Sequence, residues 1–179
     1  MEINLEGNNG AKHWYALYIK HHHEFRIKAK FDALDIENYL PVATKIKQWS
    51  DRKKKVTEPL LWGYIFIKAT EKERLASLEV DFVFRCVSER GVAAKIPEYQ
   101  IENMRNFIMD DTEYVVVQGL VAGSKVRIKS GPFEGVEGIL IDNGNNNDFA
   151  VSIDLLNRTI VTKIDDPKLL EVVRNTPES

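Results

Sequence analysis

The chain has 179 residues, which suits one ordinary domain or two small ones. Its 44% hydrophobic residues suffice for a core, and its formal net charge of -2 excludes an overall basic field, so any nucleic-acid site must be local. The single cysteine, Cys86, excludes an intrachain disulfide and fits a reducing compartment. No apolar run approaches membrane-spanning length and residues 1–12 lack the order of a signal peptide, so we expect a cytoplasmic protein outside the membrane.

The first elements expected are a tail, a strand and a helix. Residues 1–12 predict a flexible tail, and residues 13–20 (HWYALYIK) predict a strand because they are rich in aromatic and β-favouring residues. A helix is expected over residues 24–40, because Pro41 follows directly. Its apolar side chains form two stripes on opposite sides, Phe25, Ala29, Ala33 and Ile36 on one and Ile27, Phe31 and Leu34 on the other. The helix is therefore either buried on two sides or leaves one stripe for a partner.

Two strands, residues 42–49 and 55–69, are expected to flank the charged turn SDRKKK. Within GYIFIK, Tyr64 and Phe66 point to one face of the strand and the two isoleucines to the other. Both faces are therefore apolar, whereas a strand of a half-exposed sheet shows polar residues on one side. Either another layer of the protein or a partner must cover the second face.

The rest of the first part continues to alternate strands and helices. A short helix over residues 71–79, a strand over 82–88 and a helix from Pro97 to Ile108 are expected. Residues 13–110 thus predict an α+β domain with an antiparallel sheet. Residues 111–121 predict a linker.

Short strands and glycine turns fill residues 122–179. The strand segments are KVRIKS, GPFEGVEGILI, FAVSID and RTIVTKI, and DNGNNN between two of them predicts a loop. Strands this short and close, with no helix between them, predict a small all-β barrel. Gly131, Gly135 and Gly138 with Pro132 form an ordered strand–turn–strand pattern, because glycine permits positive φ and close backbone approach.

The stretch KIKQWSDRKKK concentrates charge. From Lys45 to Lys55 it holds six cations and one anion, so a hairpin here would have a cationic tip. Each phosphate contact by such a tip would release counterions, and Trp49 could stack on an unpaired base. The alternative is a solvated turn without a ligand.

Three consecutive histidines, residues 21–23, follow the first strand. They cannot converge on one metal from a helix, because neighbouring side chains diverge by about 100°, and no zinc-spaced cysteine or carboxylate accompanies them. A solvated or phosphate-facing cluster beside Lys20 and Arg26 is the better interpretation. Nucleophile elbow, P-loop and zincin motifs are absent, and Cys86 lies in an apolar strand, so we expect neither an enzyme nor a cofactor nor a metal.

Together, HWYALYIK, YLPVATKIKQW and TEPLLWGYIFIK resemble the N-terminal domain of NusG-type transcription elongation factors, and VRIKSGPFEGVEGILI resembles the KOW motif that follows it. The resemblance spans roughly residues 13–173. It implies an α+β fold, with a NusG-type N-terminal domain followed by a small SH3-like all-β KOW barrel. The strands are most similar to the specialised paralogues, the RfaH-like and capsule-locus UpxY-type antiterminators.

The resemblance implies a transcription antitermination and elongation factor that suppresses pausing and termination. It would act as a monomer on a restricted set of operons, such as those for polysaccharide biosynthesis. The family's apolar surface binds the β′ clamp helices of RNA polymerase, and the matching residues here are Tyr18, Leu61, Tyr64 and Phe66.

The paralogues also contact the exposed non-template DNA strand. The matching positions here are Lys20, His21, His23, Arg26 and Lys30. We add Arg52, Lys53 and Lys54 of the basic turn as nucleic-acid-binding candidates.

Three departures from the family pattern stand out. Trp62 replaces the usual proline before the GY pair, and no threonine-rich loop for the polymerase gate loop is evident. Where the general factor has an isoleucine-phenylalanine-glycine turn that contacts a ribosomal protein and a termination factor, residues 154–158 read DLLNR. Leu155 and Leu156 could keep an apolar contact with such a partner.

Two other function classes stay open. A KOW-containing ribosome- or RNA-binding protein would not act on polymerase, although such proteins are usually strongly basic. The other class is an enzyme that uses the histidines to bind a metal.

Overall fold

A computed structural model describes residues 10–109, 112–142, 147–164 and 170–172. The chain divides into two compact units. The first unit comprises Met1–Pro41 and Leu61–Glu98, and the second comprises Val42–Leu60 and Tyr99–Ser179. Within the described ranges, no helix is long and apolar enough to cross a membrane.

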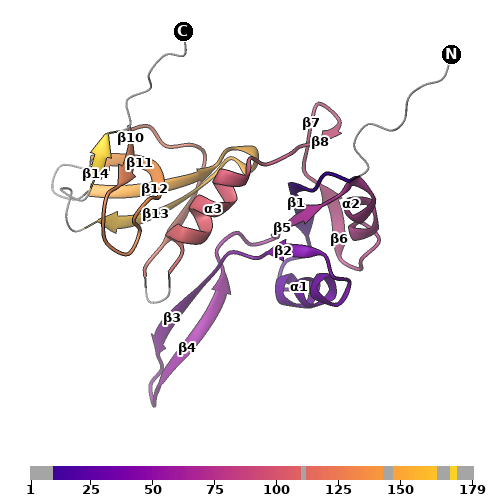
Figure 1. Ribbon diagram of the computed structural model, residues 1–179. Helices are drawn as coiled ribbons and strands as arrows, with labels where there is room; N and C mark the ends of the chain where they lie inside the picture. The colour runs from indigo at the N-terminus through magenta and orange to yellow at the C-terminus, as the bar shows by residue number, and fades with distance from the viewer. Residues whose placement is uncertain (1–9, 110–111, 143–146, 165–169, 173–179) are drawn as a thin grey trace, which may run out of the picture. The chain divides into compact units, whose positions relative to one another are not determined.

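A four-stranded antiparallel sheet forms the centre of the first unit (Figure 1). Its strands, in spatial order, are β2 (Glu37–Tyr39), β5 (Tyr64–Ala69), β1 (His13–Ile19) and β6 (Val83–Cys86). The same unit holds helices α1 (Glu24–Ala33) and α2 (Glu71–Ser77) and the short pair β7 (Ser88–Glu89) and β8 (Val92–Ala93).

The structure answers the question raised by GYIFIK. Ile65, Phe66 and Ile67 all have zero solvent exposure. Because consecutive strand residues point to opposite faces, β5 is buried on both sides. Trp14 and Ala16, which share a face with Phe66 across the β1–β5 register, are buried as well.

Helix α1 is shorter than the sequence predicted and ends at Ala33 instead of residue 40. Asp35 takes a left-handed backbone with φ of 56° and stops the helix. The N–H of Ile36 donates to the carbonyl of Phe31 (3.0 Å) and the N–H of Asp35 to that of Asp32 (3.2 Å), which is the Schellman pattern. Residues 37–39 are thereby released to form β2.

Helix α1 buries only one of its two predicted stripes. Ile27 and Phe31 are inside, whereas Phe25 is 48% exposed and Ala29 and Ala33 are exposed too. Ile36, the fourth member of the stripe of Phe25, lies beyond the end of the helix and is buried. Leu34, predicted beside Ile27 and Phe31, is 54% exposed because it caps the helix end. The stripe of Phe25 therefore faces solvent, and two-sided burial of this helix was the wrong alternative for this structure.

The second unit contains a hairpin, a helix and a sheet. The hairpin strands are β3 (Val42–Gln48) and β4 (Lys53–Pro59), and the helix is α3 (Glu98–Phe107), of which Glu98 belongs to the first unit. The six-stranded antiparallel sheet has the order β14 (Leu170–Val172), β10 (Ser124–Ile128), β11 (Glu137–Asp142), β12 (Asn147–Ile153), β13 (Arg158–Ile164) and β9 (Val115–Gln118). A 3₁₀ turn, η1 (Asp154–Leu156), joins β12 to β13. Together the two units confirm the α+β fold with an all-β C-terminal sheet.

Helix α3 packs against this sheet. The ring of Phe107 lies 5.3 to 5.5 Å from those of Tyr114, Phe133 and Phe149. The Tyr114 hydroxyl donates to the Phe107 carbonyl at 2.6 Å, and the Asn103 side chain bonds the backbone of Glu137. Strand β9 arises inside the segment for which the sequence predicted a linker.

The three glycines singled out in the sequence serve two purposes. Gly131 and Gly135 have φ of 92° and 84°, and the N–H of Gly135 donates to the carbonyl of Ile128 in the turn after β10. At Gly138 a Cβ would lie 2.4 Å from the carbonyl oxygen of Ala150, so only glycine lets β11 approach β12. Turn geometry and close strand contact thus explain this pattern.

Candidate functional site

Three aromatic rings form a row across the sheet of the first unit, which we name the aromatic row: Tyr64, Tyr18 and Phe84. Tyr18 lies opposite Tyr64 in the β1–β5 register, and their ring centroids are 5.5 Å apart. Phe84, from the strand on the other side of β1, lies 5.7 Å from Tyr18 and is 59% exposed. The guanidinium of Arg85 lies 5.6 Å from the Tyr18 ring. Such an exposed aromatic cluster with an arginine has the composition of a protein-binding surface.

The predicted polymerase-binding residues divide into two pairs. Tyr18 and Tyr64 are half-buried and lie in the aromatic row. Leu61 is 3% exposed and Phe66 is fully buried with its ring stacked on Tyr39. Sequence reasoning missed Phe84, although the alternation in FVFRCVS placed apolar residues on both faces of β6, as in GYIFIK.

The turn that precedes β5 explains how Trp62 replaces proline. The N–H of Tyr64 donates to the carbonyl of Leu61 at 3.2 Å, and Gly63 has a left-handed φ of 79°, as in a type II turn. Trp62 takes the second position, where proline is common but not required. The buried Glu24 accepts from the Gly63 N–H at 3.0 Å, and the Ile19 N–H donates to the Gly63 carbonyl at 2.8 Å. The turn is therefore fixed to α1 and β1, and β5 begins in register without the proline.

The three histidines contact three different neighbours. His21 packs on Gly63, where a Cβ would lie 2.8 Å from its Nε2 atom. The ring of His22 lies 5.0 Å from that of Trp62, and the ring of His23 lies 4.3 Å from that of Phe82. No group of three metal-ligating side chains that could hold a metal ion was found among the described residues.

Cations surround Phe82 at the same end of the first unit. The Nζ atom of Lys20 lies 5.1 Å and the guanidinium carbon of Arg26 lies 5.2 Å from its ring centroid. Lys30 follows Arg26 by four residues on α1 and so shares its side of the helix. We name the group of Lys20, the three histidines, Arg26 and Phe82 the cationic end; Lys30 is its neighbour along the helix.

Left-handed backbones gather at the cationic end. His22 has φ of 65° and Phe82 has φ of 72°, and Gly63, which packs on His21, has φ of 79°. The carbonyl of Phe82 accepts from the Lys20 N–H at 2.9 Å, which holds this arrangement. For a bulky residue such a backbone is costly, and strained residues concentrate at sites of function.

The basic turn predicted from the sequence is the tip of the β3–β4 hairpin. Arg52, Lys53 and Lys54 are all exposed, as is Trp49 at 56%. Among the described residues, the hairpin strands pair only with each other. The nucleic-acid candidates are thus divided between the cationic end and this hairpin.

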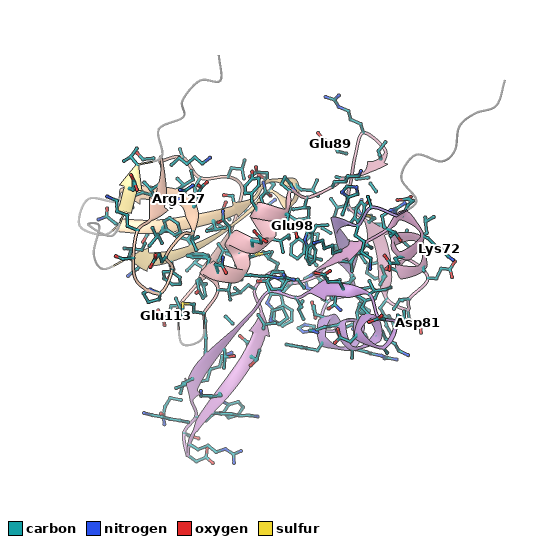
Figure 2. The ribbon with its side chains drawn as sticks, viewed as in Figure 1. Lys72, Asp81, Glu89, Glu98, Glu113 and Arg127 are labelled. Atoms are coloured by element: carbon teal, nitrogen blue, oxygen red, sulfur yellow. The ribbon has the colours of Figure 1, made fainter. Side chains whose placement is uncertain are left out.

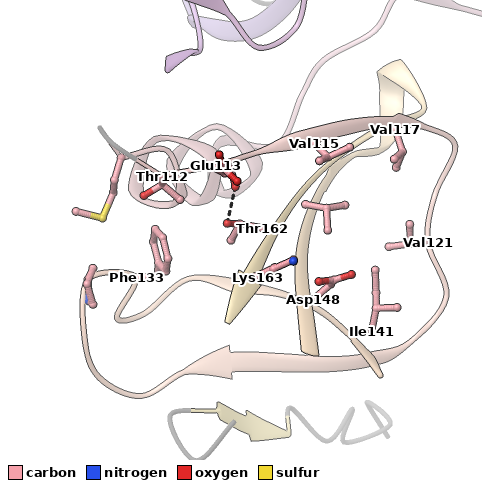
Figure 3. A pocket seen from close by; sticks show the side chains of 13 residues that line it. Thr112, Glu113, Val115, Val117, Val121, Phe133, Ile141, Asp148, Thr162 and Lys163 are labelled. Carbon is pink, nitrogen blue, oxygen red and sulfur yellow. Dashed lines mark hydrogen bonds between the residues drawn. The ribbon is translucent and has the colours of Figure 1, made fainter. Parts of the chain in front are cut away.

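The sheet of the second unit carries an apolar groove of about 790 Å³ (Figure 3). Val115, Val117, Val121 and Ile141 line it together with Asp148 and other residues. The two leucines predicted to contact a second partner lie outside this lining, in η1. Leu156 is 6% exposed, whereas Leu155 is half-exposed.

The comparisons with known proteins identify the family. The model of the family described as Transcription termination factor nusG matches residues 12–105, more than half of the chain. The chain therefore belongs to the NusG family, whose members are transcription factors and not enzymes. Comparison with curated proteins gives no match.

One of the matching solved structures supports this fold. A structure of Thermotoga maritima NusG that reports its domain interaction is 20% identical, with 91% of this chain and 98% of that chain covered at a TM-score of 0.50. Two conformations of the MjSpt4:Spt5 complex also match. Conformation A is 15% identical with a TM-score of 0.29, covering 89% of this chain and 97% of that chain. Conformation B is 15% identical with a TM-score of 0.32, covering 90% and 97%.

Proposed function

We propose that this chain is an elongation and antitermination factor that binds transcribing RNA polymerase through the aromatic row. The observation that carries the proposal is the exposure of Phe84 beside Tyr18 and Tyr64 in a member of the NusG family. The ring surface that is exposed in the free protein is unfavourable in water, and a partner that covers it gains binding free energy. The partner surface would be the β′ clamp helices of RNA polymerase, as the resemblance of this sequence to NusG-type factors implies.

The rings of the aromatic row are held in place before a partner arrives. Tyr18 contacts both other rings, so the row has few alternative conformations to lose on binding. Leu61 and Phe66 are buried, and we assign them to the support of this surface and not to direct contact. Truncating a central ring of such a surface should cost about 2 kcal/mol or more of binding.

The cationic end would reach DNA when the aromatic row is bound. Both belong to the first unit, and β1 connects them, since Tyr18 lies two residues before Lys20. Lys20 and Arg26 would contact phosphates of the non-template strand, and the histidine rings of the cationic end would contact its unpaired bases. Phosphate contacts position such a strand, whereas base contacts would select the DNA signal of a restricted set of operons.

The proposed mechanism requires no chemistry at the site. A factor that binds the elongating form of polymerase better than the paused form shifts the population toward elongation by its difference in affinity. Reduced pausing and passage through terminators follow. Leu155 on the second unit is the residue we propose for contact with a further partner, a ribosomal protein or termination factor.

Single-round transcription by the cognate polymerase through a pause site and a terminator tests this proposal. Wild type should increase read-through and Phe84→Ala or Tyr64→Ala should not. Phe25→Ala is the matched control, because Phe25 is also an exposed phenylalanine of the first unit but lies on α1. Phe66→Ala is unsuitable here, since emptying a buried site costs about 3–5 kcal/mol of stability.

Two outcomes would contradict the proposal. Equal read-through with wild type, Phe84→Ala and Phe25→Ala would remove the aromatic row from the mechanism. If the wild-type protein does not change read-through and does not co-purify with polymerase, the result favours a ribosome- or RNA-binding protein instead. Dependence of read-through on one upstream DNA segment, lost with Arg26→Gln, would support the restricted role.

A further inference from the structure

The β3–β4 hairpin carries cations on both of its faces. The register pairs Lys47 with Lys54, Ile46 with Lys55 and Gln48 with Lys53. Side chains opposite each other in an antiparallel pair share a face, and successive residues alternate. One face therefore holds Lys45, Lys47 and Lys54, and the other holds Lys53 and Lys55. Figure 2 shows side chains projecting from both sides of this ribbon.

Most of these charges are uncompensated. Lys47 pairs with Glu58 at 2.6 Å, whereas the described residues include no ion pair of Lys45, Arg52, Lys53, Lys54 or Lys55. Lys47 and Lys54 also lie directly opposite each other, which disfavours the hairpin. A two-stranded hairpin is at most marginally stable alone, so the like charges weaken an element that has little stability to lose. Anions on both sides of the ribbon would relieve the repulsion.

The shape of the hairpin indicates which polyanion fits. A surface that lies flat on phosphates needs cations on one face only, whereas a ribbon between two phosphate backbones needs them on both. The major groove of B-form DNA is about 12 Å wide and admits a two-stranded β-ribbon. The major groove of A-form RNA is too deep and narrow for side chains to read.

An exposed aromatic side chain marks the tip. The backbone N–H of Trp49 donates to the carbonyl of Arg52 at 2.8 Å and closes the turn, and the Trp49 side chain is 56% exposed. Proteins that bind the minor groove of DNA frequently insert an apolar side chain between base steps, and aromatic side chains also stack on unpaired bases. Trp49 is an exposed aromatic side chain among cations and is therefore suited to a contact with the bases.

We propose that the β3–β4 hairpin is an arm that enters a groove of double-stranded DNA, with its two lysine faces against the two backbones and Trp49 at the base steps. The proposal deepens the nucleic-acid role proposed above and rests on it only for the presence of duplex near the bound factor. It concerns a different ligand from the unpaired strand assigned to the cationic end.

Fluorescence anisotropy of the full chain with a labelled DNA duplex tests the arm without polymerase. The two pairs of face substitutions below should weaken duplex binding more than single-strand binding, because the cationic end supplies the latter. Lys45→Gln/Lys54→Gln on one face and Lys53→Gln/Lys55→Gln on the other should each lower the slope of log K against log salt by about 2, because each phosphate contact contributes about 0.9. The control pair Lys72→Gln/Lys125→Gln removes the same charge from exposed positions elsewhere and should leave the slope unchanged.

Binding that depends on one face only would contradict the groove geometry. Equal losses of duplex and single-strand affinity in the face variants would contradict the assignment of duplex DNA to the hairpin. If the slope of log K against log salt stays unchanged in both face variants, the hairpin makes no phosphate contacts and is a solvated element without a ligand. Because Phe84→Ala should bind duplex like wild type, loss of duplex binding in the face variants and loss of read-through in Phe84→Ala are separate results. Either proposal can therefore fail alone.

Tryptophan fluorescence tests the tip. In a Trp62→Phe background the exposed tryptophan is Trp49, since Trp14 is 2% exposed. Duplex DNA should quench its emission and protect it from acrylamide. Unchanged emission and acrylamide access at saturating duplex would contradict a Trp49 contact with the bases.

Discussion

Gly63 and Gly91 have almost the same backbone and opposite surroundings, with φ of 79° and 81°. A Cβ at Gly63 would lie 2.8 Å from His21, whereas a Cβ at Gly91 would meet nothing within 4 Å. Gly91→Ala should therefore cost only the left-handed strain, about 1–2 kcal/mol. Gly63→Ala should cost about 1–3 kcal/mol more from overpacking. Urea unfolding of both variants measures the difference, and equal losses would mean that His21 moves aside freely.

Individual residues were only partly predictable from the sequence. Alternation correctly assigned Tyr64 and Phe66 to one face, since the period of a strand is a local property. It could not show that Phe66 is buried and Phe84 exposed, because burial depends on segments distant in the sequence. The contact of His22 with Trp62 likewise arises from two turns that the sequence separates by about forty residues.

Among the elements, the end of α1 offers a direct test. Asp35 holds φ of 56° at the position where glycine is usual in a Schellman motif. Asp35→Gly should stabilise the protein by about 0.5–1 kcal/mol, since glycine adopts this backbone without strain. Thermal unfolding should show a higher Tm. A lower Tm would mean that the aspartate side chain contributes more than its strained backbone costs.

Helix α2 begins with a capping box that should make stability depend on pH. The Thr70 N–H donates to Glu73 at 2.7 Å, and this bond, with help from Lys12, lowers the pKa of Glu73 below its usual 4.5. Because the folded pKa is depressed, the ionised carboxylate stabilises the fold above pH 4.5, and this contribution fades as pH falls through the folded pKa. Glu73→Gln should cost about 0.5–1 kcal/mol at pH 7. The difference from wild type should shrink in acid, and a constant difference would refute this origin.

Element types were more predictable than element limits. The run of aromatic and β-favouring residues in β1 is a local signal, and the structure has this strand. The single strand predicted over residues 55–69 is wrong, because the turn between Leu61 and Tyr64 divides it into β4 and β5, which lie in different sheets. The predicted helix over residues 24–40 was too long, because Asp35 takes the left-handed backbone that ends α1. No glycine stands at this position or the next, so the sequence lacks the usual signal for a helix end. Strand β9 was missed because its pairing partner, β13, lies about forty residues later.

At the scale of the whole molecule, α3 belongs with the six-stranded sheet. The side chains of Asn103 and Tyr114 hold it there through hydrogen bonds to backbone groups of Glu137 and Phe107. Asn103→Ala/Tyr114→Phe should therefore speed amide hydrogen exchange in α3 and leave α1 and α2 unchanged, because exchange follows cooperative units. Mass spectrometry of peptides from each helix measures this. Faster exchange spread equally over all three helices would contradict the division into two units.

The hairpin has a further consequence for how the protein distributes itself in a cell. Its six cations from Lys45 to Lys55 belong to a chain whose formal net charge is -2. Chromosomal DNA offers an immense excess of irrelevant duplex, and a uniformly basic protein would spend most of its time there. With six of its 25 lysines and arginines gathered on one hairpin and a formal net charge of -2, the protein would bind irrelevant duplex through that hairpin and more weakly than a uniformly basic protein would. It would then dissociate readily and reach transcribing polymerases, for which we propose the aromatic row as the binding surface.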